Sequence, residues 1–304
     1  MQYKGSNITQ KNMAKIFLIT CTFFGLVFGY AQEKDTNATE KKHLKILSWN
    51  IYMLPNPANP KNKLTKAQII GDYLANCEYD ILVLQEAFDY RARNIITDCL
   101  KENYPYRIGP GNARNFSFKT NSGIWILSKI PISLVHEIDF TNCQGIDCFS
   151  RKGAVMVEGN FNEQAFQLVG THLESGGPDK IRVKQFQEIK NLLLEPNKKS
   201  MVPQIICGDF NTEMEDEVNY PILKEILNVE NFEVCGEVKY SSDGKANDLK
   251  SYSKDQCIID YIFLRPNGHI IRSIKTYISA ITKSWKKGHR DLSDHYAISA
   301  EIVF

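Results

Sequence analysis

Short polar side chains follow several apolar segments of this chain, and they are the residues best placed to do chemistry. Asp209 and Asn211 come directly after an apolar run that ends in glycine. Side chains two positions apart on a strand point to the same face, so this carboxylate and amide are expected to converge. Asn50, Glu86 and His172 end three further apolar runs. Polar groups at so many strand ends indicate one shared pocket.

A second pair, Asp260 and His295, consists of residue types that commonly form a histidine base and the carboxylate that orients it. Asp260 lies within the apolar segment 258–263, where a buried carboxylate is costly unless it is paired. His295 follows Asp294 immediately before the last strand-like segment, and it is the natural candidate for that pairing.

These groups predict a hard-cation site that hydrolyses a phosphate ester. Oxygen-rich sites without cysteine favour Mg²⁺, with Mn²⁺ or Ca²⁺ as alternatives. Such an ion polarises phosphoryl oxygens, a histidine accepts the proton of water, and a second acid assists the leaving alkoxide. The sequence has neither a Walker-type phosphate loop nor a GxSxG elbow, so nucleotide cradling and serine esterase chemistry lack local support.

The elements that must position these groups are mostly strands. Helix-like periodicity covers 66–77, 90–102, 180–194 and 216–227. In the third segment, Ile181, Phe186, Ile189, Leu192 and Leu193 fall near one face. Further strand-like runs cover 124–127, 132–138, 154–158, 258–264, 270–278 and 296–303. A single parallel sheet would need a helix between most strands, and residues 104–171 show none. An α+β fold with two packed sheets flanked by helices is therefore expected.

Size and charge restrict the partners. The chain has 304 residues, 43% of them apolar, and a net charge of +2. This fits one large domain or two small ones. A balance so close to neutral gives no strong attraction to nucleic acid or to anionic membranes, and no stable nucleic-acid partner is expected.

Residues 1–31 are expected to be a cleavable signal peptide. Lys15 precedes the apolar run 16–27, and Gly29-Tyr30-Ala31 supplies the small-x-small cleavage pattern. The run is shorter than the about 20 residues that a spanning helix needs. Residues 32–43 then form a polar leader expected to be disordered, and 44–304 the catalytic domain. The predicted location is secreted or periplasmic, which is an oxidising compartment.

The cysteines give one preferred disulfide, Cys143 with Cys148, which lie close in a glycine-containing loop. Cys207 lies inside an apolar strand and is expected to be a buried thiol. Two further pairings stay open, Cys77 with Cys99 and Cys235 with Cys257.

Six short motifs resemble, in order, those of the endonuclease/exonuclease/phosphatase superfamily. They are Ser48-Trp49-Asn50, Leu84-Gln85-Glu86, Gly170-Thr171-His172-Leu173, Gly208-Asp209-Phe210-Asn211, Ile259-Asp260-Tyr261-Ile262 and Ser293-Asp294-His295. The narrower resemblance is to secreted bacterial neutral sphingomyelinases. It rests on 50–54, 85–89, 128–132 and 143–153, the last including Ser150-Arg151-Lys152-Gly153.

The resemblance implies a four-layer α/β/β/α sandwich with the site at one end of the sheets. Glu86 with Asn50 close by would hold Mg²⁺. His295 would be the general base for water, oriented by Asp260. Asp294 would lie by the metal or the phosphate.

The remaining roles follow in the same way. Asp209 and Asn211 would position water and phosphate, and His172 would contact the phosphate and protonate the leaving oxygen. Lys152 and Trp285 would contact substrate or membrane. In the resemblance, Trp285 belongs to a hairpin before the last motif, where one tryptophan flanked by lysines suits an interface.

The expected reaction is Mg²⁺-dependent hydrolysis of sphingomyelin to ceramide and phosphocholine at a membrane surface, by a monomer. Three alternatives stay open. The same fold acts as a nuclease or an inositol-phosphate phosphatase, it takes another head group such as ceramide phosphoethanolamine, or it is an inactive secreted binding module.

Overall fold

The computed structural model describes residues 43–55, 60–114, 118–230, 232–250 and 253–304. The predicted signal peptide lies outside this part of the chain, as does the leader except for its last residue. From His43 on, the described residues belong to one compact unit, Lys41–Phe304. Within them, no helix is long and apolar enough to cross a membrane.

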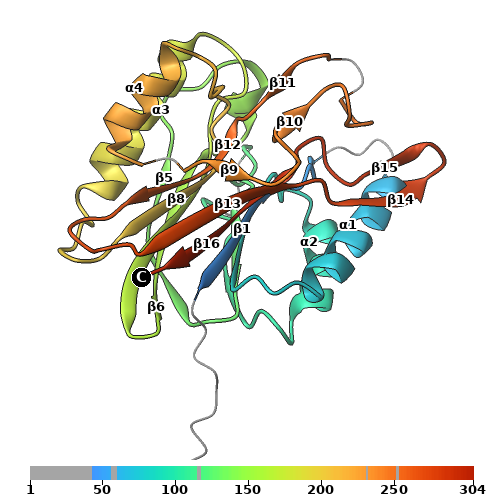
Figure 1. The fold of residues 1–304 in the computed structure, drawn as a ribbon. Coiled ribbons are helices and arrows are strands. Elements are labelled where there is room, and N and C mark those ends of the chain that lie inside the picture. Colours follow the sequence, from blue (N-terminus) through green and yellow to red (C-terminus); the bar gives the residue numbers. More distant parts are fainter. Residues whose placement is uncertain (1–42, 56–59, 115–117, 231, 251–252) are drawn as a thin grey trace, which may run out of the picture. The chain divides into compact units, whose positions relative to one another are not determined.

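Two large mixed sheets form the centre of the fold (Figure 1). The first sheet has seven strands in the order β3 (Tyr106–Ile108), β4 (Trp125–Ser128), β2 (Ile81–Gln85), β1 (Leu44–Asn50), β16 (Ala297–Val303), β13 (Ser273–Ser279) and β9 (Val234–Cys235). The second has five, in the order β12 (Asp260–Arg265), β8 (Gln204–Asp209), β7 (Gln164–His172), β6 (Gly153–Phe161) and β5 (Ile132–Asp139). Two hairpins stand apart, β10 (Ser242–Asp243) with β11 (Gln256–Cys257) and β14 (Thr282–Lys286) with β15 (His289–Asp291).

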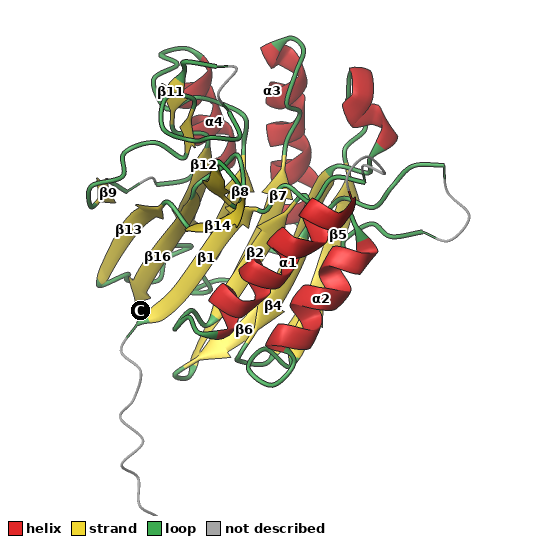
Figure 2. Ribbon diagram, turned by 90° about the vertical axis from the view of Figure 1, so that its right-hand side faces the viewer, coloured by secondary structure: helices red, strands yellow, loops and turns green. Residues whose placement is uncertain are grey.

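Helices cover the outer face of each sheet, which confirms the predicted α+β sandwich (Figures 1 and 2). The helices α1 (Pro60–Ala75) and α2 (Tyr90–Leu100) lie on the first sheet, and α3 (Asp179–Glu188) and α4 (Asn219–Leu227) on the second. Strand β1 shows why both faces must be covered. Ile46 packs in the core between the sheets, whereas Leu47 and Trp49 pack in the core beneath α1 and α2.

Several helix boundaries differ from those that the apolar periodicity of the sequence predicts. The segment after α3 continues as a π-helical turn, Ile189–Leu194. The wider turn rotates the side chains, so Leu192 is 48% exposed instead of lying on the apolar face. Helix α4 begins three residues later than expected because the Asp216 carboxylate accepts the backbone N–H groups of Val218 and Asn219. The region 104–171 does contain one short 3₁₀ turn, Gly145–Phe149.

The disulfide prediction is confirmed, since Cys143 and Cys148 are bonded with their Cα atoms 5.3 Å apart. Cys207 is a buried thiol, as expected. The other pairings are not formed among the described cysteines: Cys77, Cys99, Cys235 and Cys257 are all free thiols.

Asp89 ties α1 to α2 and is expected to be a large contributor to stability. Its carboxylate accepts the backbone N–H groups of Arg91 and Ala92 at the start of α2 and pairs with buried Lys63 at 3.0 Å. Burial opposes ionisation, but these partners outweigh it and hold the pKa of Asp89 well below its ordinary value. The stabilisation is therefore present above the unfolded-state pKa of about 3.9 and is lost as pH falls below it.

Replacing Asp89 by alanine should lower the free energy of unfolding by about 2–4 kcal/mol at pH 7, because a helix cap is lost and a buried cation loses its carboxylate. Urea unfolding at pH 7 and pH 3 measures this, and the difference between variant and wild type should narrow at pH 3. Asp98→Ala, on the exposed face of the same helix, is the matched control. An equal loss in both variants would contradict the capping role.

Candidate active site

The topology brings the predicted residues to one edge of both sheets. Strands β1 and β2 are parallel, as are β7 and β8, so Asn50, His172 and Asp209 all end strands at that edge. Strands β12 and β16 run antiparallel to β8 and β1, so they begin there. Asp260 is consequently the first residue of β12 and not an interior one, and it lies directly opposite Asp209.

Gly208 lets two of these strand ends approach each other closely. A Cβ atom at this position would lie 1.9 Å from the carbonyl oxygen of Thr171, and the φ of 148° is one that side chains disfavour. The register pairs His172 with Asp209. Their side chains meet, with His172 Nε2 3.4 Å from Asp209 Oδ2.

His295 and Asp260 form the predicted pair. His295 Nδ1 donates to Asp260 Oδ2 at 2.9 Å, and His295 Nε2 lies 3.6 Å from Asp209 Oδ2. Burial favours the neutral ring, but the carboxylates of Asp260 and Asp209 outweigh it and raise the pKa of His295 to about 10. The Ser241 hydroxyl accepts the backbone N–H groups of Ile259 and Asp260 and so fixes the start of β12.

Glu86 and Asn50 lie together on the first sheet. The Asn50 amide donates to Glu86 Oε1 and to Asp209 Oδ2, both at 3.2 Å, and its oxygen accepts the backbone N–H of Tyr52. Burial, followed by the nearby charge of Asp294, raises the pKa of Glu86 to about 7. Glu86 also adopts a positive φ of 55°, a strained conformation that aims a side chain at a functional site in many proteins.

These residues fit a hard cation on one structural observation. Among the described residues, Glu86 Oε2 is a buried oxygen without any hydrogen-bond partner. An unpaired buried carboxylate oxygen is costly, and a divalent cation would satisfy it. Asp209, Asp260 and His295 also place their ligand atoms within 4.8 Å of one another. In that group both ring nitrogens of His295 already face carboxylates, which is the arrangement of a proton acceptor rather than of an open metal site.

His172, Lys152 and Asn211 form the other side of the site. Lys152 Nζ donates to His172 Nε2 at 3.2 Å and to the carbonyl of Leu173 at 2.7 Å, and the Asn211 amide donates to that same carbonyl at 3.1 Å. Burial and the Lys152 ammonium lower the pKa of His172 to about 3. The expectation that strand alternation points Asn211 to the same face as Asp209 is wrong. Strand β8 ends at Asp209, and Asn211 has a φ of 49°, so it lies outside the strand.

A cavity of about 710 Å³ is lined by part of the predicted set, and its described lining does not include Asn50, Asp209, Asn211, Asp260 or His295. Glu86, Lys152, His172 and Asp294 line it. Its remaining lining is largely apolar and includes Tyr52, Leu54, Pro55, Phe88, Ile146 and Phe149. The cavity thus combines charged groups that suit a phosphate with apolar walls.

Trp285 lies on the β14–β15 hairpin and is partly buried. Its indole N–H donates to the carbonyl of Asp291 at 2.8 Å, and the side chain packs against the core beneath α1 and α2. The ammonium of Lys66 lies 5.5 Å from the Trp285 ring and 5.1 Å from the Tyr52 ring. Burial lowers the pKa of Lys66 to about 8, while Asp294 and Glu86 act in the opposite direction.

Lys66, Ser241 and Asp147 are site residues that sequence reasoning missed. Asp147 lies in the disulfide-closed turn, and its carboxylate accepts from Lys152 Nζ at 2.9 Å and from the backbone N–H and hydroxyl of Ser175. The one available signal is its position between Cys143 and Cys148, just before the motif that contains Lys152. Burial opposes ionisation, yet Lys152 and Ser175 outweigh it and lower the pKa of Asp147.

Asp147→Asn is expected to lower kcat/KM on a soluble phosphodiester about 10- to 100-fold, because Lys152 loses the charge that fixes it beside His172. Steady-state kinetics measures the effect. Asp139→Asn, which removes the ion pairs to Arg114 and Arg151 outside the cavity lining, should change it less than threefold. Equal rates for Asp147→Asn and wild type would remove Asp147 from the site.

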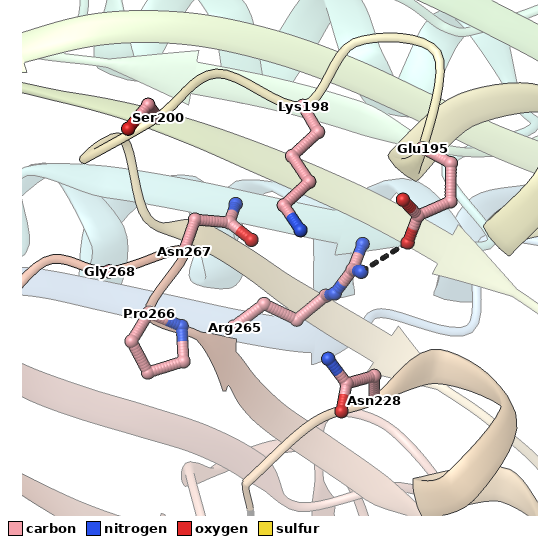
Figure 3. A pocket seen from close by; sticks show the side chains of 8 residues that line it. All are labelled: Glu195, Lys198, Ser200, Asn228, Arg265, Pro266, Asn267 and Gly268. Atoms are coloured by element: carbon pink, nitrogen blue, oxygen red, sulfur yellow. Dashed lines mark hydrogen bonds and ion pairs between the residues drawn. The ribbon is translucent and has the colours of Figure 1, made fainter.

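A second cavity, of about 810 Å³, lies at the opposite end of β12 (Figure 3). It is lined by Arg265, whose guanidinium pairs with Glu195 Oε1 at 2.5 Å and donates to Gln204 Oε1 at 2.9 Å. Among the described residues that line it there is no histidine, and the only carboxylate is that of Glu195, which is paired with Arg265. This composition suits a structural role for Arg265 rather than hydrolysis.

Comparison with known proteins decides the family. The sequence profile described as the Endonuclease/Exonuclease/phosphatase family matches residues 47–295, which include every predicted catalytic and metal residue. The chain belongs to this family. Among curated members, it is 32% identical over 271 residues to sphingomyelinase C 2 of Leptospira interrogans, a match that covers 77% of this chain and 42% of that protein.

Two further similar proteins match this chain over almost their whole length. Sphingomyelinase C of Listeria ivanovii is 28% identical over 323 residues, covering 94% of this chain and 93% of that protein. A crystal structure of beta toxin from Staphylococcus aureus superposes with a TM-score of 0.75 at 25% identity, covering 84% of this chain and 99% of that one. The chain therefore spans less than half of the Leptospira protein but nearly all of the other two.

Proposed function

We propose that this chain is a secreted, divalent-metal-dependent phosphodiesterase that hydrolyses sphingomyelin to ceramide and phosphocholine. The observation that carries the proposal is the convergence of Glu86, Asp209 and the Asp260–His295 pair at one end of the two sheets. The names of the relatives support sphingomyelin as the substrate. Fold alone would not choose among phosphodiesters.

Glu86, together with the Asn50 oxygen and Asp294, would hold the cation. The Asn50 oxygen accepts one backbone N–H and keeps a second lone pair for a ligand bond. Hard oxygen donors favour Mg²⁺ over softer ions, with Mn²⁺ or Ca²⁺ as substitutes. When bound, the cation supplies a positive charge that stabilises the negative charge developing on the phosphoryl oxygens.

His295 removes the proton from the attacking water. Asp260 accepts the hydrogen bond from Nδ1, and Nε2 lies 3.6 Å from Asp209 Oδ2. With a cation held beside Glu86, the carboxylate charges that raise the pKa of His295 would be offset, so that the ring would be neutral and Nε2 its basic nitrogen. Asp209 and the Asn211 amide position water and phosphate. The water oxygen bonds to phosphorus as the bond from phosphorus to the ceramide oxygen breaks.

Lys152 and His172 act on the phosphate and the leaving oxygen. The unliganded His172 is neutral and accepts a hydrogen bond from Lys152. An anionic phosphate bound beside both groups would raise the pKa of His172, so the ring gains a proton only with substrate present. It can then protonate the ceramide oxygen as that oxygen leaves.

A substrate panel tests the function. Sphingomyelin, ceramide phosphoethanolamine, phosphatidylcholine and DNA are each incubated with Mg²⁺ and with chelator, and the released head group or cleaved strand is quantified. We expect Mg²⁺-dependent release of phosphocholine from sphingomyelin. A preference for ceramide phosphoethanolamine would mean that the enzyme takes a different head group from the one proposed. Cleavage of DNA would mean that the protein is a nuclease, and no turnover of any substrate would mean that it is a binding module.

Export is the remaining part of the proposal. The apolar run 16–27 with its following small residues, and the Cys143–Cys148 disulfide, both suit an oxidising compartment. Mass spectrometry of the protein from culture medium or periplasm should find an N-terminus at residue 32. An intact N-terminus on cytoplasmic protein would contradict export.

A further inference from the structure

The disulfide-closed turn Gly145–Phe149 carries two large apolar side chains that point into solvent. Ile146 is 83% exposed and Phe149 is 71% exposed. Both also line the cavity that contains Glu86, Lys152 and His172. Of the large apolar side chains most exposed among the described residues, these are the two that line this cavity. We call Ile146 and Phe149 the lip.

The backbone that carries the lip is bonded on both sides. The Cys143–Cys148 bond closes the turn, and the Ser150 N–H and hydroxyl both donate to the carbonyl of Asp147. The Thr120 N–H donates to the carbonyl of Phe149 at 2.9 Å. These bonds fix the backbone of the turn in a conformation that leaves both apolar side chains exposed.

The outer side of the turn carries no charge. Its one ionised residue, Asp147, faces inward to Lys152 and Ser175. The hairpin 282–291, in contrast, presents exposed Lys283, Lys286 and Lys287. An uncharged apolar lip suits the hydrocarbon of a zwitterionic bilayer, whereas exposed lysines suit anionic surfaces.

We propose that Ile146 and Phe149 insert into the hydrocarbon of a lipid bilayer and so hold the cavity mouth over a lipid head group. This inference rests on the proposed lipid substrate. The bond to be cleaved joins the phosphate to the lipid part of the substrate, so the hydrocarbon must begin immediately beside the phosphate site. An apolar edge continuous with a phosphate-binding cavity meets that requirement.

Vesicle binding tests the lip without any turnover. Full-length protein carrying His295→Ala is sedimented with vesicles of phosphatidylcholine and sphingomyelin, and the partition constant is measured with and without Ile146→Ser/Phe149→Ser. Removing two inserted apolar side chains should weaken binding about 10- to 100-fold, and 0.5 M salt should change it little. Ile146→Leu/Phe149→Leu should restore binding, because only apolarity is required.

The matched control is Ile270→Ser/Val218→Ser, which removes two side chains that are 79% and 66% exposed and do not line the cavity. It should bind vesicles as the parent does. Undiminished binding by the lip variant would overturn the proposal, as would an equal loss in the control. A change of oligomeric state with vesicle binding kept would assign the lip to a second copy and overturn it as well.

Failure of the lip and failure of the proposed function give different results. If the wild type hydrolyses sphingomyelin and the lip variant binds vesicles normally, the lip proposal fails alone. If the wild type hydrolyses no lipid in the substrate panel, the proposed function fails whatever the vesicle experiment shows.

Discussion

Replacing His295 by alanine is expected to lower kcat on sphingomyelin about 10²- to 10⁴-fold, the range of a lost general base. His295 is the one site histidine whose ring is paired with a carboxylate on each side, Asp260 at 2.9 Å and Asp209 at 3.6 Å. Those carboxylates stabilise the imidazolium that forms when the neutral ring takes the proton from water. Stopped or discontinuous assays of phosphocholine release give kcat, and the value of KM should change far less.

The control for this prediction is His136→Ala, an exposed histidine on β5. It should retain the wild-type rate. Circular dichroism and thermal unfolding establish that both variants are folded. A His295→Ala protein with more than a tenth of wild-type kcat would contradict the assignment of the base.

Glu86→Gln should produce a loss of similar size by a different route. The substitution keeps the shape of the side chain but removes the charge whose buried oxygen has no partner among the described residues. Loss of the ion's electrostatic contribution, several kcal/mol, corresponds to a decrease in kcat/KM of about 10²- to 10⁴-fold at a fixed Mg²⁺ concentration. Isothermal titration should show weaker Mg²⁺ binding, and chelator should abolish wild-type activity.

Excess Mg²⁺ separates a metal ligand from a residue that only supports the fold. Activity of Glu86→Gln should recover in part as Mg²⁺ is raised, whereas His295→Ala should not respond. Glu158→Gln, an ion pair with Lys199 on the protein surface, is the control and should keep the wild-type metal dependence. An unchanged Mg²⁺ dependence in Glu86→Gln would reject Glu86 as a ligand.

Much of the fold and of the site could be predicted because the relevant signals are local. An apolar run predicts a buried strand, and the first polar residue after the run predicts where the strand ends. Asn50, His172 and Asp209 were located in this way and are the last residues of β1, β7 and β8. Asp260 was matched with His295 because a buried carboxylate requires a partner, and the structure confirms the contact.

The rest depends on distances between segments that the sequence does not encode locally. Lys66 has the composition of any helical lysine, and only the packing of α1 against Tyr52 and Trp285 buries it near the site. The Ser241 hydroxyl fixes the start of β12 by accepting the backbone N–H groups of Ile259 and Asp260, which are 18 and 19 residues away in the sequence. Leu192 was placed on the wrong face because a π-helical turn leaves no mark on the apolar pattern.

The proposed catalytic apparatus is divided between the two sheets. Asn50 ends β1, Glu86 follows β2 and His295 precedes β16, all three at the first sheet. His172, Asp209 and Asp260 belong to strands of the second sheet. The hydrogen bonds from Asn50 to Asp209 and from His295 to Asp260 therefore connect the two sheets at the active site. A slight sliding of one sheet over the other would separate the two halves while each stayed intact. Heating or mild denaturant should thus inactivate the protein before its secondary structure melts.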